Sequence, residues 1–88
     1  MSAKTFNVGI RYSALEGIEV VAQSAIQAAE RYISLVIESR PAVYELLQET
    51  KEFCVIYEEN DCVEVSNFNI DDFRIDDKVN KVEYKHIS

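Results

Sequence analysis

The chain has 88 residues, of which 48% are hydrophobic and 28% are charged, and its formal net charge is −7. This length predicts one domain, residues 1–88, with little volume for an enclosed substrate pocket, and the composition lies far from that of a disordered chain. No apolar run approaches the ~18 residues of a membrane span and no secretion signal precedes the first strand pattern, so we expect neither a membrane protein nor a secreted one.

The first part of the chain predicts a β-hairpin. Apolar side chains alternate with other residues from Phe6 to Tyr12, which is the period of a strand with one buried face. The alternation returns from Ile18 to Gln23, after a turn that Gly17 permits. A short connection of this kind joins antiparallel neighbours.

A long helix is predicted next. Ser24 and Gln27 have the S-x-x-Q spacing of a capping box, so the helix should begin at Ala25. Apolar residues then recur at helical spacing, which gives the helix one face for the core. Pro41 disfavours the α region at the residue before it, so the helix should end near 38–39.

A second, shorter helix is predicted over 42–50. Proline is tolerated in a first helical turn, and an apolar stripe follows it. A competing interpretation makes 33–37 a strand, because the sequence Ile-Ser-Leu-Val-Ile is β-prone. The capping box at the start of the first helix favours the helical interpretation.

The remaining residues predict a second hairpin and a last strand. Residues 53–57 are apolar on both faces, which is typical of a central strand, and 58–61 form a polar turn. The return strand runs through 63–65, and the alternation breaks at 66–67, where we expect a bulge or bend. A final edge strand is expected at 82–84.

The predicted fold class is α+β, in the order β-β-α-α-β-β-β. A small antiparallel sheet of about four to five strands should pack against one long and one short helix.

The negative charge is concentrated in one segment. Residues 52–77 contain nine acids and one base, whereas 1–51 contribute −1 and 78–88 contribute +2. Such charges can keep a small protein soluble and guard strand edges, or they can form a docking face for a basic partner. The candidate partner-binding residues are Glu58, Glu59, Asp61, Glu64, Asp71, Asp72, Asp76 and Asp77.

A divalent metal at the aspartate pairs 71–72 and 76–77 is a third interpretation of the acidic segment. It is the weakest of the three, because the EF-hand loop needs a glycine and a terminal glutamate, and neither Gly9 nor Gly17 is near. The same two glycines cannot form a phosphate-binding loop. We expect no cofactor and no metal.

Residues for catalysis are scarce. His86 is the only histidine and stands three positions from the end of the sequence, and the Cys and His residues are too few for a structural zinc site. Cys54 and Cys62 are expected to be free thiols in a cytoplasmic, reducing compartment, with a cross-strand disulfide as the open alternative. The negative field disfavours direct binding of nucleic acid. We predict that the protein is not an enzyme.

The first third of the chain resembles a group of small proteins from phages and plasmids. Residues 6–10, 17–24 and 25–29 are similar to the ββα start of DpnD/PcfM-like proteins and of some anti-CRISPR proteins. The resemblance implies a mobile-element protein that acts by contact with another protein, and it carries over no catalytic residues.

The sequence supports three hypotheses for the function. The first is a non-enzymatic inhibitor or adaptor that binds a basic, nucleic-acid-handling protein through the acidic face. The second is a structural module that forms a homodimer through a strand edge or through tyrosine-bearing helix faces. The third is a small metal-dependent enzyme.

Overall fold

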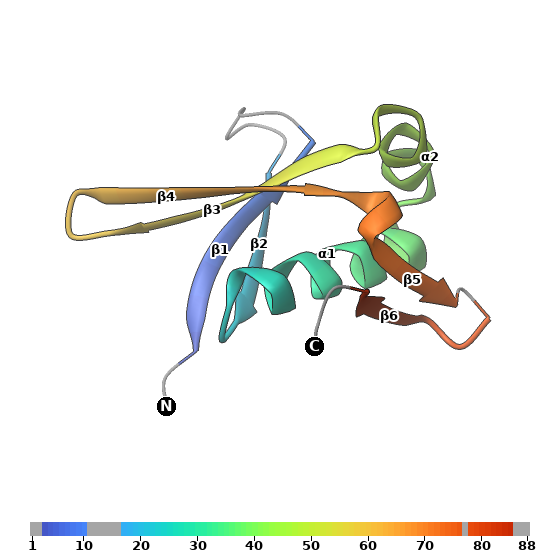
Figure 1. Ribbon diagram of the computed structural model, residues 1–88, viewed down its shortest axis with the longest axis horizontal. Coiled ribbons are helices and arrows are strands. Elements are labelled where there is room, and N and C mark those ends of the chain that lie inside the picture. The colour runs from blue at the N-terminus through green and yellow to red at the C-terminus, as the bar shows by residue number, and fades with distance from the viewer. Residues whose placement is uncertain (1–2, 11–16, 77, 86–88) are drawn as a thin grey trace.

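The order of helices and strands agrees with the sequence prediction except for one additional strand, β5, before the last one. The computed structural model describes residues 3–10, 17–76 and 78–85, and in it two strands precede two helices and further strands come after them (Figure 1). The elements are β1 (Lys4–Gly9), β2 (Ile18–Ala22), α1 (Ala25–Ser39), α2 (Pro41–Thr50), β3 (Glu52–Glu59), β4 (Cys62–Asn69), the 3-10 helix η1 (Ile70–Asp72), β5 (Phe73–Asp76) and β6 (Lys81–Tyr84). The fold class is α+β, as predicted.

The main sheet contains four antiparallel strands in the order β2-β1-β3-β4. β1 pairs with β2 on one side, as at Phe6 and Val20, and with β3 on the other, as at Val8 and Val55. These four side chains are buried and share the face that α1 crosses (Figure 1). No described helix lies across the opposite face of this sheet.

The predicted bulge near residues 66–67 is absent. β4 pairs with β3 without interruption, from Asn69 opposite Glu52 to Cys62 opposite Glu59. The apolar alternation breaks in the sequence because Val65 and Phe68, three residues apart, lie on opposite faces of one regular strand. The predicted turn is also shorter than expected: Glu59 still belongs to β3, and the turn contains two residues.

The last predicted strand exists but does not join the main sheet. β6 pairs with β5 in a separate two-stranded sheet, with Phe73 opposite Tyr84. The chain changes direction at η1, where the Asn69 side chain accepts a hydrogen bond of 2.8 Å from the backbone N–H of Asp71. This small hairpin packs beside α1, since the N–H of Tyr84 donates to Glu30 at 2.9 Å.

The predicted start of α1 is confirmed. The Ser24 hydroxyl accepts a hydrogen bond of 3.1 Å from the backbone N–H of Gln27. The Gln27 side chain reaches back to the N–H of Gln23 at 2.7 Å, one residue earlier than in a standard capping box. Residues 33–37 belong to α1, so the competing strand interpretation is wrong.

The cap gives a direct test of how α1 begins. Ser24→Ala removes the acceptor of the Gln27 N–H, and we expect it to lower the free energy of unfolding by about 1 kcal/mol. Urea denaturation measures the change. Ser39→Ala, at the exposed end of the same helix, is the control and should change the stability far less. Equal effects of the two substitutions would contradict the role of the cap.

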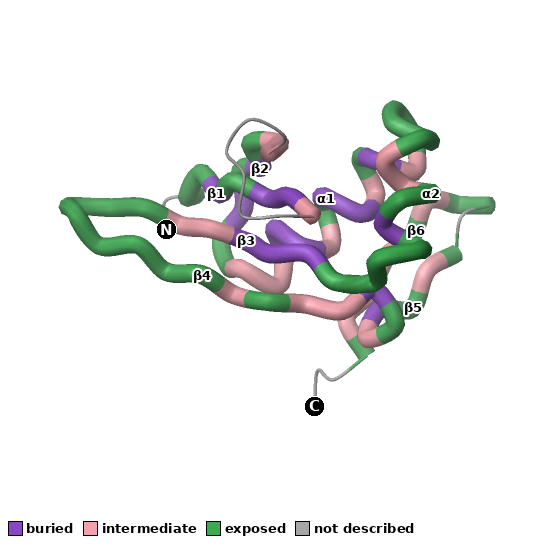
Figure 2. The backbone as a smooth tube through the Cα atoms, turned by 90° about the horizontal axis from the view of Figure 1, so that it is seen from above, coloured by how far each residue is buried: buried purple, intermediate pink, exposed green. Residues whose placement is uncertain are grey.

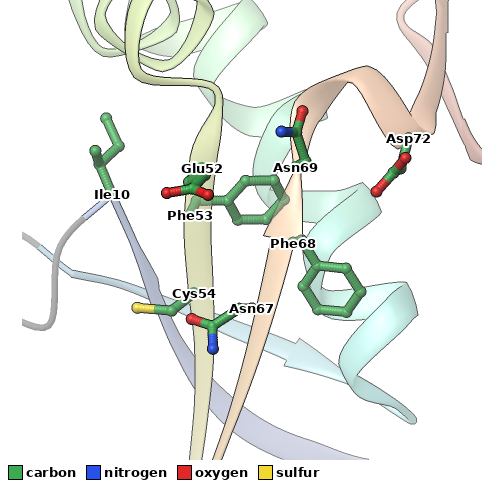
Figure 3. A pocket seen from close by; sticks show the side chains of 8 residues that line it. All are labelled: Ile10, Glu52, Phe53, Cys54, Asn67, Phe68, Asn69 and Asp72. Carbon is green, nitrogen blue, oxygen red and sulfur yellow. The ribbon is translucent and has the colours of Figure 1, made fainter.

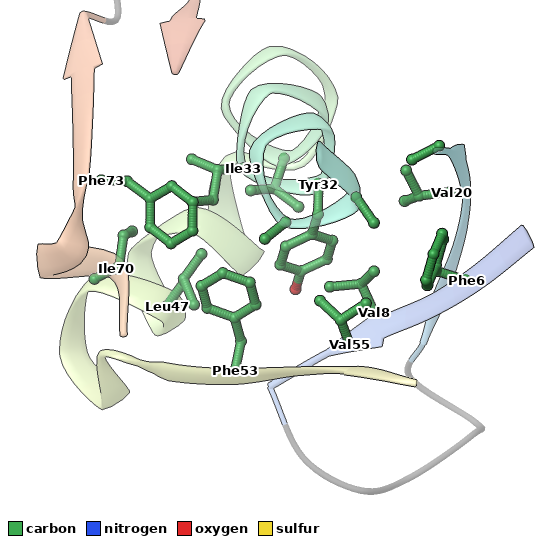
Figure 4. Close-up of a cluster of buried hydrophobic side chains, with 14 residues drawn as sticks. Phe6, Val8, Val20, Tyr32, Ile33, Leu47, Phe53, Val55, Ile70 and Phe73 are labelled. Atoms are coloured by element: carbon green, nitrogen blue, oxygen red, sulfur yellow. The ribbon is translucent and has the colours of Figure 1, made fainter. Parts of the chain in front are cut away.

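The core lies between α1 and the main sheet and continues under α2 and the small hairpin (Figure 4). Its buried residues are Phe6, Val8, Val20, Ala22, Ala28, Ala29, Tyr32, Ile33, Val36, Leu47, Phe53, Val55, Ile70 and Phe73. The ring of Phe53 lies 5.5 Å from that of Tyr32, 5.8 Å from that of Phe68 and 5.9 Å from that of Phe73, measured between centroids. This aromatic contact joins the helix, the sheet and the hairpin.

Candidate protein-binding site

The β3–β4 hairpin projects beyond the rest of the main sheet. β1 pairs only with residues 54–56 of β3, so no described strand pairs with the end of the hairpin on the β1 side (Figure 1). We call residues 57–65 the arm. Most of the arm is exposed, and it forms the long tip in Figure 2. The arm projects because β3 and β4 are longer than β1, the strand that pairs with β3 on its other side.

Two residues of the arm form its turn. Asn60 and Asp61 have φ values of 50° and 65°, the left-handed region, and they link the paired residues Glu59 and Cys62. Two positive φ values in a two-residue loop are typical of a type I′ turn, which matches the twist of antiparallel strands. Asn and Asp tolerate this conformation better than most residues, so the sequence specifies the turn locally.

The structure divides the predicted acidic residues into two groups. Glu58, Glu59, Asp61 and Glu64 all lie in the arm and are exposed. The other described acids, Asp71, Asp72 and Asp76, come after β4 at the opposite end of the hairpin. From Glu59 to Glu52, β3 advances seven residues, which is about 23 Å at the usual rise of a strand.

Two acids of the second group have partners within the protein. Asp71 forms an ion pair with Lys51 at 3.1 Å, and the Asp76 carboxylate accepts a hydrogen bond of 3.2 Å from the N–H of Lys78. Asp77 lies outside the described residues, as does His86. The seven predicted residues that the structure describes therefore do not form one face, and the arm is the part where acids gather.

The arm has an uneven charge. Between residues 57 and 65 it contains four acids and no base, and the two ion pairs among the described residues, Lys51–Asp71 and Lys81–Glu83, lie elsewhere. The nearest described cation contact is that of Lys4, whose Nζ lies 5.0 Å from the centre of the Tyr57 ring. The arm therefore presents a negative field to solvent.

Tyr57 places a hydrogen-bonding hydroxyl group on one face of the arm. Its hydroxyl donates a hydrogen bond of 2.7 Å to Glu59. This hydrogen bond raises the pKa of Tyr57, and partial burial and the negative charges of Glu59 and Glu64 raise it further. The phenol therefore remains a protonated donor that holds the Glu59 carboxylate in place.

The other face of the arm carries two exposed valines beside Glu58, which lies opposite Val63, and the sequence pattern alone did not show this exposure. Val63 and Val65 are 58% and 43% exposed, and Ile56 lies directly opposite Val65 in the register. A valine in a strand normally predicts burial. The sequence does contain a signal for this exposure. Side chains of a strand alternate between its two faces, so the odd-numbered valines lie on the face opposite to that of Phe68, which packs against the core.

A shallow groove of ≈ 440 Å³ lies near the other end of the hairpin (Figure 3). Cys54 and Asn67 lie on one side of the paired strands there and Phe68 on the other (Figure 3). The Cys54 thiol donates to the Gly9 carbonyl at 3.5 Å, and burial raises its pKa. A thiol held neutral in this way is a poor nucleophile.

Both cysteines are free thiols. Cys54 is buried, whereas Cys62 is exposed at the turn of the arm. Their register partners are Asn67 and Glu59, and their positions in the pleat place them on opposite faces of the hairpin. This placement rules out the cross-strand disulfide between them.

Potential metal ligands are scattered over the described ranges 3–10, 17–76 and 78–85. Within these ranges, no group of three or more His, Cys, Asp or Glu side chains is arranged to hold a metal ion. In the same part of the chain, neither helix has the length and apolar character needed to cross a membrane.

Comparisons of the chain with protein families, with curated proteins and with solved structures found no match. The resemblance of the first third to phage and plasmid proteins therefore stays a prediction. The function of this protein has to be inferred from the geometry and charge of the arm.

Proposed function

We propose that this protein is a non-enzymatic protein-binding module that engages a basic surface of a partner protein through the arm. The observation that carries the proposal is the position of Glu58, Glu59, Asp61 and Glu64. All four are exposed on a hairpin end that projects from the sheet, and residues 57–65 contain no base. A negative, projecting surface accelerates encounter with positive surfaces and repels nucleic acid.

The partner class is inferred from the same chemistry. Carboxylates spaced along two strands can occupy the places that phosphates take on a basic protein, so a nucleic-acid-handling protein is the partner we expect. The resemblance of residues 6–10 and 17–29 to proteins of phages and plasmids supports a role as an inhibitor or adaptor from a mobile element. The free thiols of Cys54 and Cys62 support a reducing, cytoplasmic location.

Charge reversal tests this proposal. The double substitution Glu58→Lys and Glu59→Lys should weaken binding of a fluorescent lysine-containing peptide by about tenfold at low salt, and the remaining binding should depend less on salt. Fluorescence anisotropy at several salt concentrations measures both quantities. Because the two residues lie next to the turn and are exposed, the substitutions change the charge of the arm without changing the core.

The matched control moves the same charge change to another surface. Glu45→Lys and Glu49→Lys alter two exposed residues of α2 and give the same net charge as the arm variant. We expect this control to bind the peptide almost as the unaltered protein does. If both double variants lose the same affinity, net charge alone determines binding and the proposed site is wrong.

A homodimer is the competing proposal. It is favoured by one observation, the long outer edge of β4, which pairs with no other described strand. The two proposals differ in what occupies that edge.

A further inference from the structure

We propose that the partner binds by adding a strand to the outer edge of β4 at Val63–Val65. This inference rests on the proposed function and names its mode of binding: the partner contributes an extended segment in which apolar and basic residues alternate. Main-chain hydrogen bonds would supply affinity, and the two faces of the arm would select the side chains.

The ladder between β3 and β4 shows which backbone groups face outward. A two-residue turn makes its flanking residues, here Glu59 and Cys62, a hydrogen-bonded pair, and such pairs then recur at every second residue. At the other end, the N–H of Ile70 donates to the carbonyl of Lys51 at 2.7 Å. Counted in steps of two from Glu59 and Cys62, these two residues are again a hydrogen-bonded pair, so the alternation holds along the whole hairpin. The N–H and C=O groups of Val63 and Val65 therefore point away from β3.

Other strand edges in the structure are occupied by side chains of α1. The guanidinium of Arg31 donates to the carbonyl of Val21 in β2. Glu30 accepts from the N–H of Tyr84 in β6 at 2.9 Å. Among the described residues, no strand pairs with the β4 edge at Val63–Val65, and β4 contains neither lysine nor proline, the residues that usually protect an edge.

The side chains around this edge define the occupant. On β4 itself, Val63 and Val65 lie on one face and Glu64 lies on the other. Behind them on β3, Ile56 lies opposite Val65 and Glu58 opposite Val63, so the first face is apolar with one carboxylate at its edge, while Tyr57 and Glu59 keep the second face polar and negative. A strand beside β4 places its successive side chains on these two faces in turn. Apolar residues at one parity and lysine or arginine at the other complement both faces.

A second copy of this chain fits the edge less well. An antiparallel pair of β4 strands centred on this segment would place Glu64 directly opposite Glu64 of the second copy. Like charges directly opposite in a sheet are destabilising. The arm also has no base to neutralise the acids of another arm. The chemistry therefore favours a basic segment of a different protein.

The test uses a probe peptide as long as β4, eight residues, that alternates lysine and valine. Val65→Pro removes an outward N–H but no hydrogen bond to β3, so the hairpin is retained while a strand on the outer edge loses a donor. We expect probe affinity to fall by about tenfold or more. A probe N-methylated at alternate residues keeps its charge and side chains, and it should also bind about tenfold more weakly.

The outcomes separate this inference from the proposed function. If Val65→Pro and the N-methylated probe bind normally while charge reversal at Glu58 and Glu59 weakens binding, strand addition is wrong and the proposed function stands. If charge reversal has no effect either, both fail. If sedimentation shows a dimer that Val65→Pro dissociates, a second copy occupies the edge and the inference is overturned.

Amide hydrogen exchange provides a measurement that does not depend on the proline variant. Adding the probe to the unaltered protein should slow exchange at the N–H groups of Val63 and Val65 by about tenfold or more. The N–H of Glu64 faces β3 and serves as the internal reference. Unchanged exchange at Val63 and Val65 in the saturated complex would overturn strand addition, whatever the proline variant does.

Discussion

Phe53→Ala is expected to lower the free energy of unfolding by about 3–5 kcal/mol, the usual cost of removing a buried aromatic ring. Phe53 is 2% exposed, and its ring contacts those of Tyr32, Phe68 and Phe73. Its loss would leave a cavity at the junction of α1, the main sheet and the β5–β6 hairpin. A domain of this size has a total stability of about 4–13 kcal/mol, so the variant should lose a large part of it. Urea denaturation followed by circular dichroism measures the change.

Phe68→Ala is the matched control for this prediction. Phe68 pairs with Phe53 across the β3–β4 ladder but is only half-buried, so the same truncation removes less buried surface. We expect a smaller loss of stability than at Phe53. If the two variants lose equal stability, Phe53 is not the centre of the core.

The second large effect concerns alkaline pH. Burial, followed by the nearby Cys54 thiol, raises the pKa of Tyr32 from 10.0 to about 12, and Arg40 opposes the shift. Between these values the unfolded chain loses the phenol proton while the folded protein keeps it. The folded state binds more protons there, so stability is fully present below pH 10 and falls as the pH rises toward 12. The loss for a shift of this size is about 3 kcal/mol.

Tyr32→Phe isolates this contribution. The variant has no phenol proton, so its unfolding free energy should fall less steeply above about pH 10 than that of the unaltered protein. Urea titrations at several pH values between about 8 and 12 measure the difference in slope. Because the lysines and the other tyrosines titrate equally in both proteins, parallel curves would show that Tyr32 has no raised pKa.

Local patterns in the sequence predicted most of the elements. The capping residues Ser24 and Gln27 fixed the start of α1 at Ala25, since a cap is a contact between neighbours along the chain. Alternation located β2, because burial on one face imposes a period of two, and a short run that is apolar on both faces located β3. β1 begins at Lys4, and the part of the predicted first strand beyond Ile10 lies outside the described residues. α2 begins at Pro41 itself.

The predictions that failed concern features of the fold that depend on contacts between residues distant in the sequence. The register of β4 explains the false bulge, and a strand's register is set by its partner, not by its own residues. The separate pairing of β5 with β6 depends on the turn at η1 and on α1, which supplies Glu30 to Tyr84. Neither contact leaves a periodic signal in the sequence.

The candidate site was predicted only in part. Counting charges located an acidic segment, and four of its residues, Glu58, Glu59, Asp61 and Glu64, do gather in the arm. The count could not show that Asp71 is paired with Lys51 at the other end of the hairpin. It also gave no sign of the exposed valines, which lie on the face of the sheet that no described helix crosses (Figure 1).

β3 has a consequence for how this protein can change over evolutionary time. One continuous strand runs from Phe53, in the centre of the core, to Glu59, in solvent. Its first half is constrained by packing, whereas the arm contributes little to the core and its surface tolerates substitution at small cost. Under the proposed function, folding and partner binding therefore depend on different residues of the same strand. Substitutions in the arm can then change which partner is bound, while the residues that hold the core stay the same.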